Sequence, residues 1–281
     1  MDKTMFFPTK VEYQEDKQNK NKGSVIIEPC YPGYGTTWGN ALRRVLLTSL
    51  EGAAVTAVKI RGARYEFSTL DYVQEDILDI ILNLKLLRLK IFKETDKPIK
   101  LTLKASGERR VTARDVDKSA DVEIVNPDLL IANLTDKKAK LEMEIWVEKG
   151  YGWVPSEEKS REDKDIGTII VDSIFTPVLN VAVNIENVRV GKRTDYDKLI
   201  LTIETDGIVS PLQAFLAASK LLAEQFNLLI ERGEKLEERE AREELAVKKK
   251  AKKRATTKEK IATKKKKKTA TAKKTAAKKK K

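Results

Sequence analysis

The chain has 281 residues, of which 41% are hydrophobic and 35% charged, and its formal net charge is +13. It holds no histidine and one cysteine, Cys30. These counts exclude Ser-His-Asp and Cys-His nucleophile arrangements, histidine-containing metal sites, cysteine-cluster zinc sites and an intrachain disulfide.

The positive charge is concentrated at one end of the sequence. Residues 248–281 carry 19 Lys or Arg and one acid, a net of +18, which leaves a net of −5 for the other 247 residues. The start lacks the apolar run of a signal peptide, and the most apolar stretch, residues 77–92, is interrupted by charges. We therefore expect a cytoplasmic protein without a membrane segment.

Two strands are predicted near the start, over residues 24–28 and 54–60. A glycine-rich turn, Gly33–Gly39, follows the first strand and precedes a helix, which is the order found in nucleotide-binding turns. Its G-x-G-x-x-x-G spacing is one residue longer than the dinucleotide fingerprint, and no acid ends a second strand at the right distance. We interpret the glycines as serving a tight turn against a neighbouring backbone.

The helix predicted over residues 37–50 has apolar residues at i, i+3, i+4, i+7 and i+8. Thr36 or Thr37 is expected to cap its start and Gly52 to end it. Leu47 and Leu50 fall beside the main stripe, so we expect this helix to be packed from two sides.

The remainder of the body alternates between strands and two further helices, which indicates the α+β class. Helices are predicted over residues 73–84 and 211–230, the second with Ser210 as cap and Pro211 at its first position. A Gly- and charge-rich loop is expected over 150–165. The remaining predicted strands cover residues 86–92, 99–104, 122–124, 140–147, 169–172, 178–186 and 199–204.

After the last predicted helix the sequence loses its apolar face. Residues 233–247 are predicted to form a charged helical extension, supported by the pairs Glu231–Lys235 and Glu238–Arg242 at i,i+4. Residues 248–281 are low-complexity Lys, Ala and Thr, and we expect them to be disordered.

Several segments together closely resemble the alpha subunit of bacterial DNA-directed RNA polymerase. The matching words are GYGTTWGNALRRVLLTSLEGAAVTAVKI from residue 33, EFST from 66, VQEDILDIILNLK from 73, DVEIVNPD from 121, GYGWVPS from 150 and RTDYDKLILTIETDG from 193. They occur in the family's order and spacing. The resemblance implies a homodimer on which the beta and beta-prime subunits assemble for transcription, while the catalysis and its magnesium belong to the large subunits.

The resemblance also implies how the chain is divided. A dimerisation subdomain comprises residues 1–52 and 176–232, and a mainly β subdomain, residues 53–175, is inserted into it. Most members of the family carry a helical DNA-binding module after a linker, but the residues after 230 lack the apolar pattern of such a module. Recognition of upstream DNA by that route is therefore not expected.

The two wide-faced helices either pack inside one monomer or form a four-helix bundle with a second copy. The resemblance implies the second arrangement. We therefore predict a dimer interface of obligate size, larger than about 2,000 Å². The predicted interface residues are Trp38, Leu42, Leu46, Leu50, Phe215, Leu222, Phe226 and Leu229.

Arg43 and Arg44 lie about 100° apart on the helix, so one of them can point outward. Taken alone, this favours an ordinary solvated or ion-paired arginine. The resemblance implies instead that Arg44, with Arg43 and Thr48 as neighbours, contacts the beta subunit. Lys85 and Arg193 are weaker candidates for contacts with the large subunits.

The acidic pairs Glu75–Asp76 and Asp195–Asp197 lack histidine partners and are interpreted as capping or solvated groups, so no cofactor or metal is expected in this chain. The basic tail can contact nucleic-acid phosphates without sequence preference, or it can simply add solubility. The tail residues proposed for this contact are Lys264, Lys265, Lys266, Lys267 and Lys268. Two rival functions follow: a nucleic-acid-binding protein acting through this tail, and a stand-alone nucleotide-binding enzyme using the glycine turn.

Overall fold

A computed structural model describes residues 7–63, 65–92, 95, 97–159, 165, 167–237, 239–240 and 242. The chain divides into two compact units, Met1–Leu222 and Ala223–Lys281. The described residues of the second unit are helical. They belong to the helix that begins at residue 211. The basic tail lies outside the described residues.

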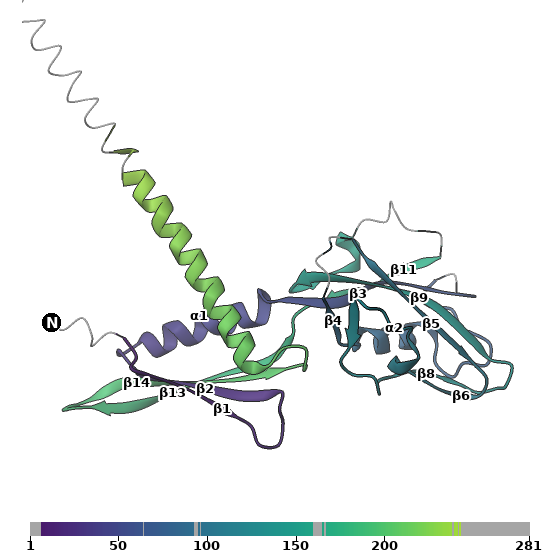
Figure 1. The fold of residues 1–281 in the computed structure, drawn as a ribbon, viewed down its shortest axis with the longest axis horizontal. Helices are drawn as coiled ribbons and strands as arrows, with labels where there is room; N and C mark the ends of the chain where they lie inside the picture. The colour runs from purple at the N-terminus through teal and green to yellow at the C-terminus, as the bar shows by residue number, and fades with distance from the viewer. Residues whose placement is uncertain are drawn as a thin grey trace, which may run out of the picture. The chain divides into compact units, whose positions relative to one another are not determined.

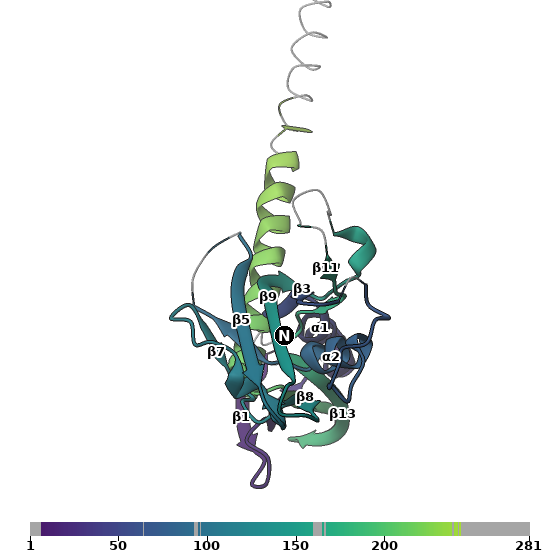
Figure 2. The same ribbon diagram turned by 90° about the vertical axis from the view of Figure 1, so that its right-hand side faces the viewer.

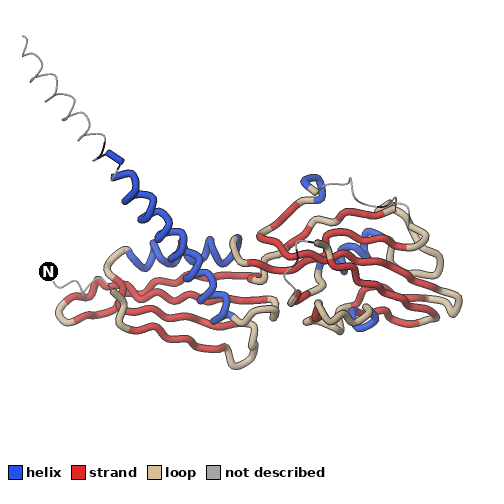
Figure 3. Tube along the Cα trace, turned by 45° about the horizontal axis from the view of Figure 1, so that its top comes forward, coloured by secondary structure: helices blue, strands red, loops and turns tan. Residues whose placement is uncertain are grey.

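The first unit contains two four-stranded antiparallel sheets (Figures 1 and 3). One has the strand order β1 (Lys10–Glu15), β2 (Lys22–Cys30), β14 (Arg193–Thr205) and β13 (Val178–Val190). Helix α1 (Tyr34–Thr48) packs against β13 and β14, and apolar side chains of α1, β2, β13, β14 and the helix from residue 211 share one core.

The other sheet has the order β11 (Thr168–Ile170), β3 (Glu51–Ile60), β9 (Lys140–Tyr151) and β5 (Ile99–Ser106). Helix α2 (Ile77–Lys85) packs against β3, on one side of this sheet (Figure 2). The described residues of this part also form three short ribbons: β4 (Leu89–Ile91) with β7 (Val122–Ile124), β6 (Arg109–Thr112) with β8 (Leu130–Leu134), and β10 (Trp153–Val154) with β12 (Ser173–Ile174). The single-turn helices η2 (Ala113–Asp115) and η3 (Ser156–Glu158) lie between strands.

The two sheets have separate hydrophobic cores. One core draws its buried residues from 53–171, and the other from 25–50 and 178–218. Where the chain crosses between them, a Cβ on Gly52 would lie 1.6 Å from the carbonyl oxygen of Phe175, so only glycine fits there. The Phe175 ring also packs on Gly150. The predicted α+β class is confirmed, because the described residues form helices together with sheets whose strands pair antiparallel, without parallel βαβ units.

Several predictions about single elements are wrong. Helix α1 begins at Tyr34, not residue 37, and ends at Thr48 rather than at Gly52, which lies in β3. Neither Thr36 nor Thr37 caps its first turn. Strands β1, β6, β8 and β12 were not predicted, and the segment expected to be a loop after residue 150 contains β10 and η3.

The last helix agrees with its predicted start. Ser210 precedes it, and the Gln213 amide donates a 3.3 Å hydrogen bond to the Ser210 hydroxyl oxygen. The helix runs over residues 211–237, longer than the predicted 211–230. Lys235 pairs with Glu231 at 2.7 Å, as the i,i+4 spacing predicts. Glu238, of the second predicted pair, lies outside the described residues.

Candidate functional site

Helix α1 is held in place by a distant carboxylate. Asp197, on β14, is 8% exposed, and its Oδ2 accepts hydrogen bonds from the amides of Gly33 at 2.9 Å and Gly35 at 3.1 Å. It therefore satisfies amides at the start of α1 that lack partners within the helix. A Cβ on Gly39 would lie 2.6 Å from Val183, so glycine permits the close approach of α1 to the sheet. The glycine turn thus serves close packing, but the neighbours of Gly35 and Gly39 are the side chains of Asp197 and Val183 and not the backbone that was predicted.

The outward face of α1 presents Arg43, Arg44 and Thr48, all exposed. Within the described part of the chain, neither guanidinium forms a hydrogen bond or an ion pair. The Thr48 hydroxyl donates to the Arg44 carbonyl oxygen at 2.8 Å, which fixes this side chain against the helix. Two unpaired arginines on a rigid helix can bind carbonyl or carboxylate oxygens of another chain.

Three predicted dimer-interface residues are buried within this chain's own core. Leu42 is 7%, Leu46 is 0% and Leu50 is 7% exposed, all packed in the cluster between α1 and the sheet. Their side chains therefore leave little surface for a second copy, and assigning them to an intersubunit contact needs correction. Periodicity located the apolar face of α1, and that face packs on β13 and β14.

The other predicted interface residues retain accessible surface. Trp38 is partly buried and makes an edge-to-face contact with Tyr34, at a centroid distance of 5.9 Å. Phe215 and Leu222 are partly buried against the core. The second unit's part of the helix carries Phe226 and Leu229 with 59% and 64% of their surface exposed. Exposed apolar residues on the same helix that were not among the predicted interface residues are Leu212, Leu216, Leu228, Ile230 and Leu236.

The two weaker candidates for large-subunit contacts are both paired within the chain. Lys85 Nζ lies 3.1 Å from Asp172 Oδ2, and hydrogen bonds from the Ser156 amide and from Lys85 lower the pKa of Asp172. Arg193 forms two hydrogen bonds to Asp195, at 3.0 and 2.6 Å, and lies over the ring of Tyr196.

An exposed apolar patch was not predicted. Tyr151, Trp153 and Ile174 are 61%, 62% and 50% exposed, and Trp153 lies directly opposite Ile174 in the β10–β12 ribbon. Exposed aromatic patches of this kind are typical of protein–protein contacts. The word GYGWVPS contains the tryptophan, but its spacing alone does not indicate whether that side chain faces the core or the solvent.

Among the described residues, no group of three or more His, Cys, Asp or Glu side chains could hold a metal ion. The acidic pairs have structural partners instead. Glu75 accepts hydrogen bonds from the backbone and side-chain amides of Asn133, both at 2.6 Å. Asp76 caps α2 by accepting from the Asp79 amide at 2.8 Å. No described helix is long and apolar enough to cross a membrane.

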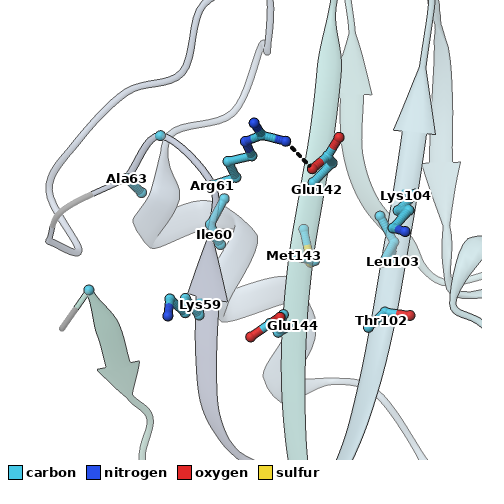
Figure 4. A pocket seen from close by; sticks show the side chains of 12 residues that line it. Lys59, Ile60, Arg61, Ala63, Thr102, Leu103, Lys104, Glu142, Met143 and Glu144 are labelled. Carbon is cyan, nitrogen blue, oxygen red and sulfur yellow. Dashed lines mark hydrogen bonds and ion pairs between the residues drawn. The ribbon is translucent and has the colours of Figure 1, made fainter. Parts of the chain in front are cut away.

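The outer face of the β3–β9–β5 sheet has a groove of about 460 Å³, shown in Figure 4. Its charges are largely paired: Arg61 reaches Glu142 at 2.7 Å, and Lys59 reaches Asp165 at 3.0 Å. The Arg61 guanidinium lowers the pKa of Glu142 below its ordinary value. Because cations and carboxylates alternate there, the groove favours no single ligand charge.

Comparison with known proteins identifies first the class and then the family. The model of the RNA polymerase Rpb3/RpoA insert domain matches residues 58–176, the part of the chain built on the β11–β3–β9–β5 sheet. The chain is therefore a protein of the class that carries this domain.

Three curated relatives, each named DNA-directed RNA polymerase subunit alpha, extend the match. The relative from Oceanobacillus iheyensis is 47% identical over 221 residues, which is 79% of this chain and 69% of the relative. Those from Symbiobacterium thermophilum and Desulforamulus reducens are both 48% identical, over 84% and 79% of this chain and 74% and 69% of their own lengths. The chain belongs to the alpha-subunit family of DNA-directed RNA polymerase.

Proposed function

We propose that this alpha subunit is a homodimeric platform: two copies associate, one copy docks the beta subunit and the other docks beta-prime. In this proposal the subunit supplies position rather than catalysis, and the magnesium that serves RNA synthesis is bound by the large subunits. The observation that carries the proposal is the row of exposed apolar side chains on the helix over residues 211–237.

Those side chains support dimerisation because their exposure is unfavourable in an isolated chain. Burying a large apolar side chain stabilises by about 1.5–3 kcal/mol, and Phe226 and Leu229 both keep more than half of their surface exposed. A second copy related by twofold symmetry would cover the same helix on both chains. We propose Trp38, Phe215, Leu222, Phe226 and Leu229 as interface residues, with Leu42, Leu46 and Leu50 supporting α1 from beneath.

Contact with the beta subunit is assigned to Arg44, with Arg43 and Thr48 beside it. The guanidinium groups are exposed and unpaired among the described residues, so binding breaks no existing ion pair. Lys85 is retained as a weaker candidate for contact with a large subunit, together with the exposed apolar patch of Trp153 and Ile174. Arg193 is retained as a peripheral contact with a large subunit.

The test is affinity purification of the tagged full chain at moderate salt from cells containing the polymerase, with subunit stoichiometry from native mass spectrometry. We expect two copies of this chain with one copy each of two very large subunits. Leu229→Glu should yield monomers without large subunits, whereas Gln225→Glu, an exposed substitution on the same helix, should leave the assembly intact. Recovery of the wild-type chain alone, or with nucleic acid only, would overturn the proposal.

A second variant separates dimerisation from docking. Arg44→Ala should preserve the dimer and reduce recovery of the beta subunit, because the backbone and core of α1 are unchanged. Arg110→Ala, which removes an exposed arginine of β6, is the matched control and should have no effect. If both arginine variants retain the beta subunit equally, the assignment of Arg44 is wrong even if the dimer itself is upheld.

A further inference from the structure

We propose that Arg88 and Asp206 form a latch that fixes the orientation of the β11–β3–β9–β5 sheet relative to the β1–β2–β14–β13 sheet. Arg88 Nε lies 3.7 Å from Asp206 Oδ2. Arg88 lies between α2 and β4, next to Leu87 and Leu89 in the core of the first sheet. Asp206 directly follows β14 of the second sheet. The ion pair therefore joins two parts of the chain that have separate cores.

Arg88 is held through its backbone by the segment after β7. Its amide donates to Asn126 Oδ1 at 2.8 Å, and its carbonyl oxygen accepts from the Val125 amide at 2.9 Å. The Asn126 side chain also donates to the Leu86 carbonyl oxygen at 2.9 Å. The Arg88 side chain is 20% exposed. Its guanidinium is thus carried by a well-bonded turn of the first part.

Asp206 is held equally firmly in the second part. Its amide donates to the carbonyl oxygen of Pro177, which directly precedes β13, at 3.0 Å. Its Oδ1 accepts from the Ile208 amide at 3.0 Å, while Oδ2 faces Arg88. The side chain is 2% exposed. Each carboxylate oxygen therefore has one partner, and the partner from the other part of the chain is Arg88.

The region between the two sheets has the form of a hinge. The extensive packing contacts of the named helices and strands lie within one part or the other. The chain crosses between the parts at Gly52 and again at Phe175, which lie against each other. Two adjacent crossings permit rotation unless a further contact opposes it. The latch supplies such a contact, together with Gly207, on which a Cβ would lie 3.5 Å from Val125.

The energetics favour a role in orientation over a role in stability. Burial raises the pKa of Asp206, although Arg88 acts to lower it. The lost hydration of the carboxylate therefore costs more than the guanidinium returns. A buried ion pair still specifies one arrangement, because separating its partners leaves a poorly hydrated charge without a counter-ion.

One consequence concerns assembly and rests on the proposed function. The charged groups proposed for large-subunit contacts lie on both parts of the chain, with Arg44 on α1 and Lys85 on α2. A fixed angle between the sheets sets the spacing of these groups before a large subunit binds. The latch itself is a property of the free chain and does not depend on that role.

Distances between two spin labels, measured by pulsed electron paramagnetic resonance at pH 7, test the proposal. The labels are attached at Lys17→Cys, in the loop after β1, and Lys137→Cys, in the loop before β9, both exposed positions. Cys30 is fully buried, and burial raises the pKa of its thiol, so it should not take the label. The labelled full chain is refolded with a large excess of unlabelled chain, so that distances between two copies do not contribute.

We expect one narrow distance distribution when the latch is intact. Asp206→Asn and Arg88→Met should each widen it about twofold, because more orientations become populated. The double variant should be no wider than either single variant, since both remove the same contact. Glu142→Gln is the matched control, because it breaks the 2.7 Å pair with Arg61 inside one sheet, and it should leave the distribution unchanged.

Thermal unfolding of the same variants separates orientation from stability. Asp206→Asn should widen the distribution without lowering the unfolding temperature at pH 7. The proposal is overturned if both latch variants keep the wild-type width, if Glu142→Gln widens the distribution as much, or if the intact chain is already as broad as the variants. A lower unfolding temperature of Asp206→Asn at unchanged width would also overturn it. None of these results bears on recruitment of the large subunits, which the purification experiment measures.

Discussion

Replacing Asp197 tests whether one buried carboxylate holds α1 on its sheet. In Asp197→Ala, the amides of Gly33 and Gly35 lose the acceptor that they reach at 2.9 and 3.1 Å. A hydrogen bond to a charged group is worth about 1.5–3 kcal/mol, and water can partly hydrate the more exposed Gly33 amide, so we expect a total loss of about 3 kcal/mol. Asp197→Asn keeps an acceptor oxygen without the charge and should lose about 1 kcal/mol.

The assay is urea unfolding followed by tryptophan fluorescence at one fixed protein concentration, because association would make stability depend on concentration. The dependence of the unfolding free energy on urea should stay constant while the midpoint falls. Asp195→Ala is the control, since this carboxylate lies on the same strand but is exposed and pairs with Arg193; it should change stability little. Equal losses for Asp197→Ala and Asp195→Ala would refute the capping role.

Two further predictions concern packing and pH. Gly39→Ala places a Cβ 2.6 Å from Val183 and 3.0 Å from Leu199, and urea unfolding should show a loss of about 1–3 kcal/mol; unchanged stability would mean that α1 shifts freely. Burial raises the pKa of Asp206 above its ordinary 3.8, while the Ile208 amide and Arg88 act in the opposite direction. The folded state therefore holds this proton more tightly than the unfolded state, so Asp206 favours folding more as pH falls towards 3.8. The wild-type chain should gain stability relative to Asp206→Asn between pH 7 and pH 4, and a constant difference would contradict this.

Features that depend on one segment of the sequence were predicted, whereas those that depend on distant residues were not. The helices were predicted because a 3.6-residue repeat of apolar side chains is visible within a single segment. The cap of α1 was not, because Asp197 lies 164 residues from Gly33 and the nearby Thr36 and Thr37 matched the local rule better. Strand β1 was missed because its sequence KVEYQE is polar and its burial pattern is almost entirely exposed. This strand forms because its backbone pairs with β2, which the side-chain pattern of its own residues does not indicate.

The prediction of the dimer interface was likewise limited to what one segment of the sequence indicates. An apolar stripe shows that a face is covered, but it does not show by what. Leu46, fully buried, and Leu229, 64% exposed, belong to stripes of the same kind. The difference arises because α1 has a sheet beneath it, whereas the later part of the last helix keeps its apolar residues accessible. Only the burial of each side chain in the folded chain separates the residues that support the fold from those available to a partner.

The charged residues proposed for large-subunit contacts differ in whether they already have an ion-pair partner within the chain. Lys85 and Arg193 already have carboxylate partners at 3.1 and 2.6 Å. A new contact through either one must compete with that pair, so the net gain on binding is small. Arg43 and Arg44 have no partner within the described part of the chain, and their helix is fixed by Asp197 from the far side. A docking subunit that supplies carboxylate or carbonyl oxygens there gains the whole interaction. We therefore propose the arginines of α1, ahead of Lys85 and Arg193, as the charged contact for a large subunit.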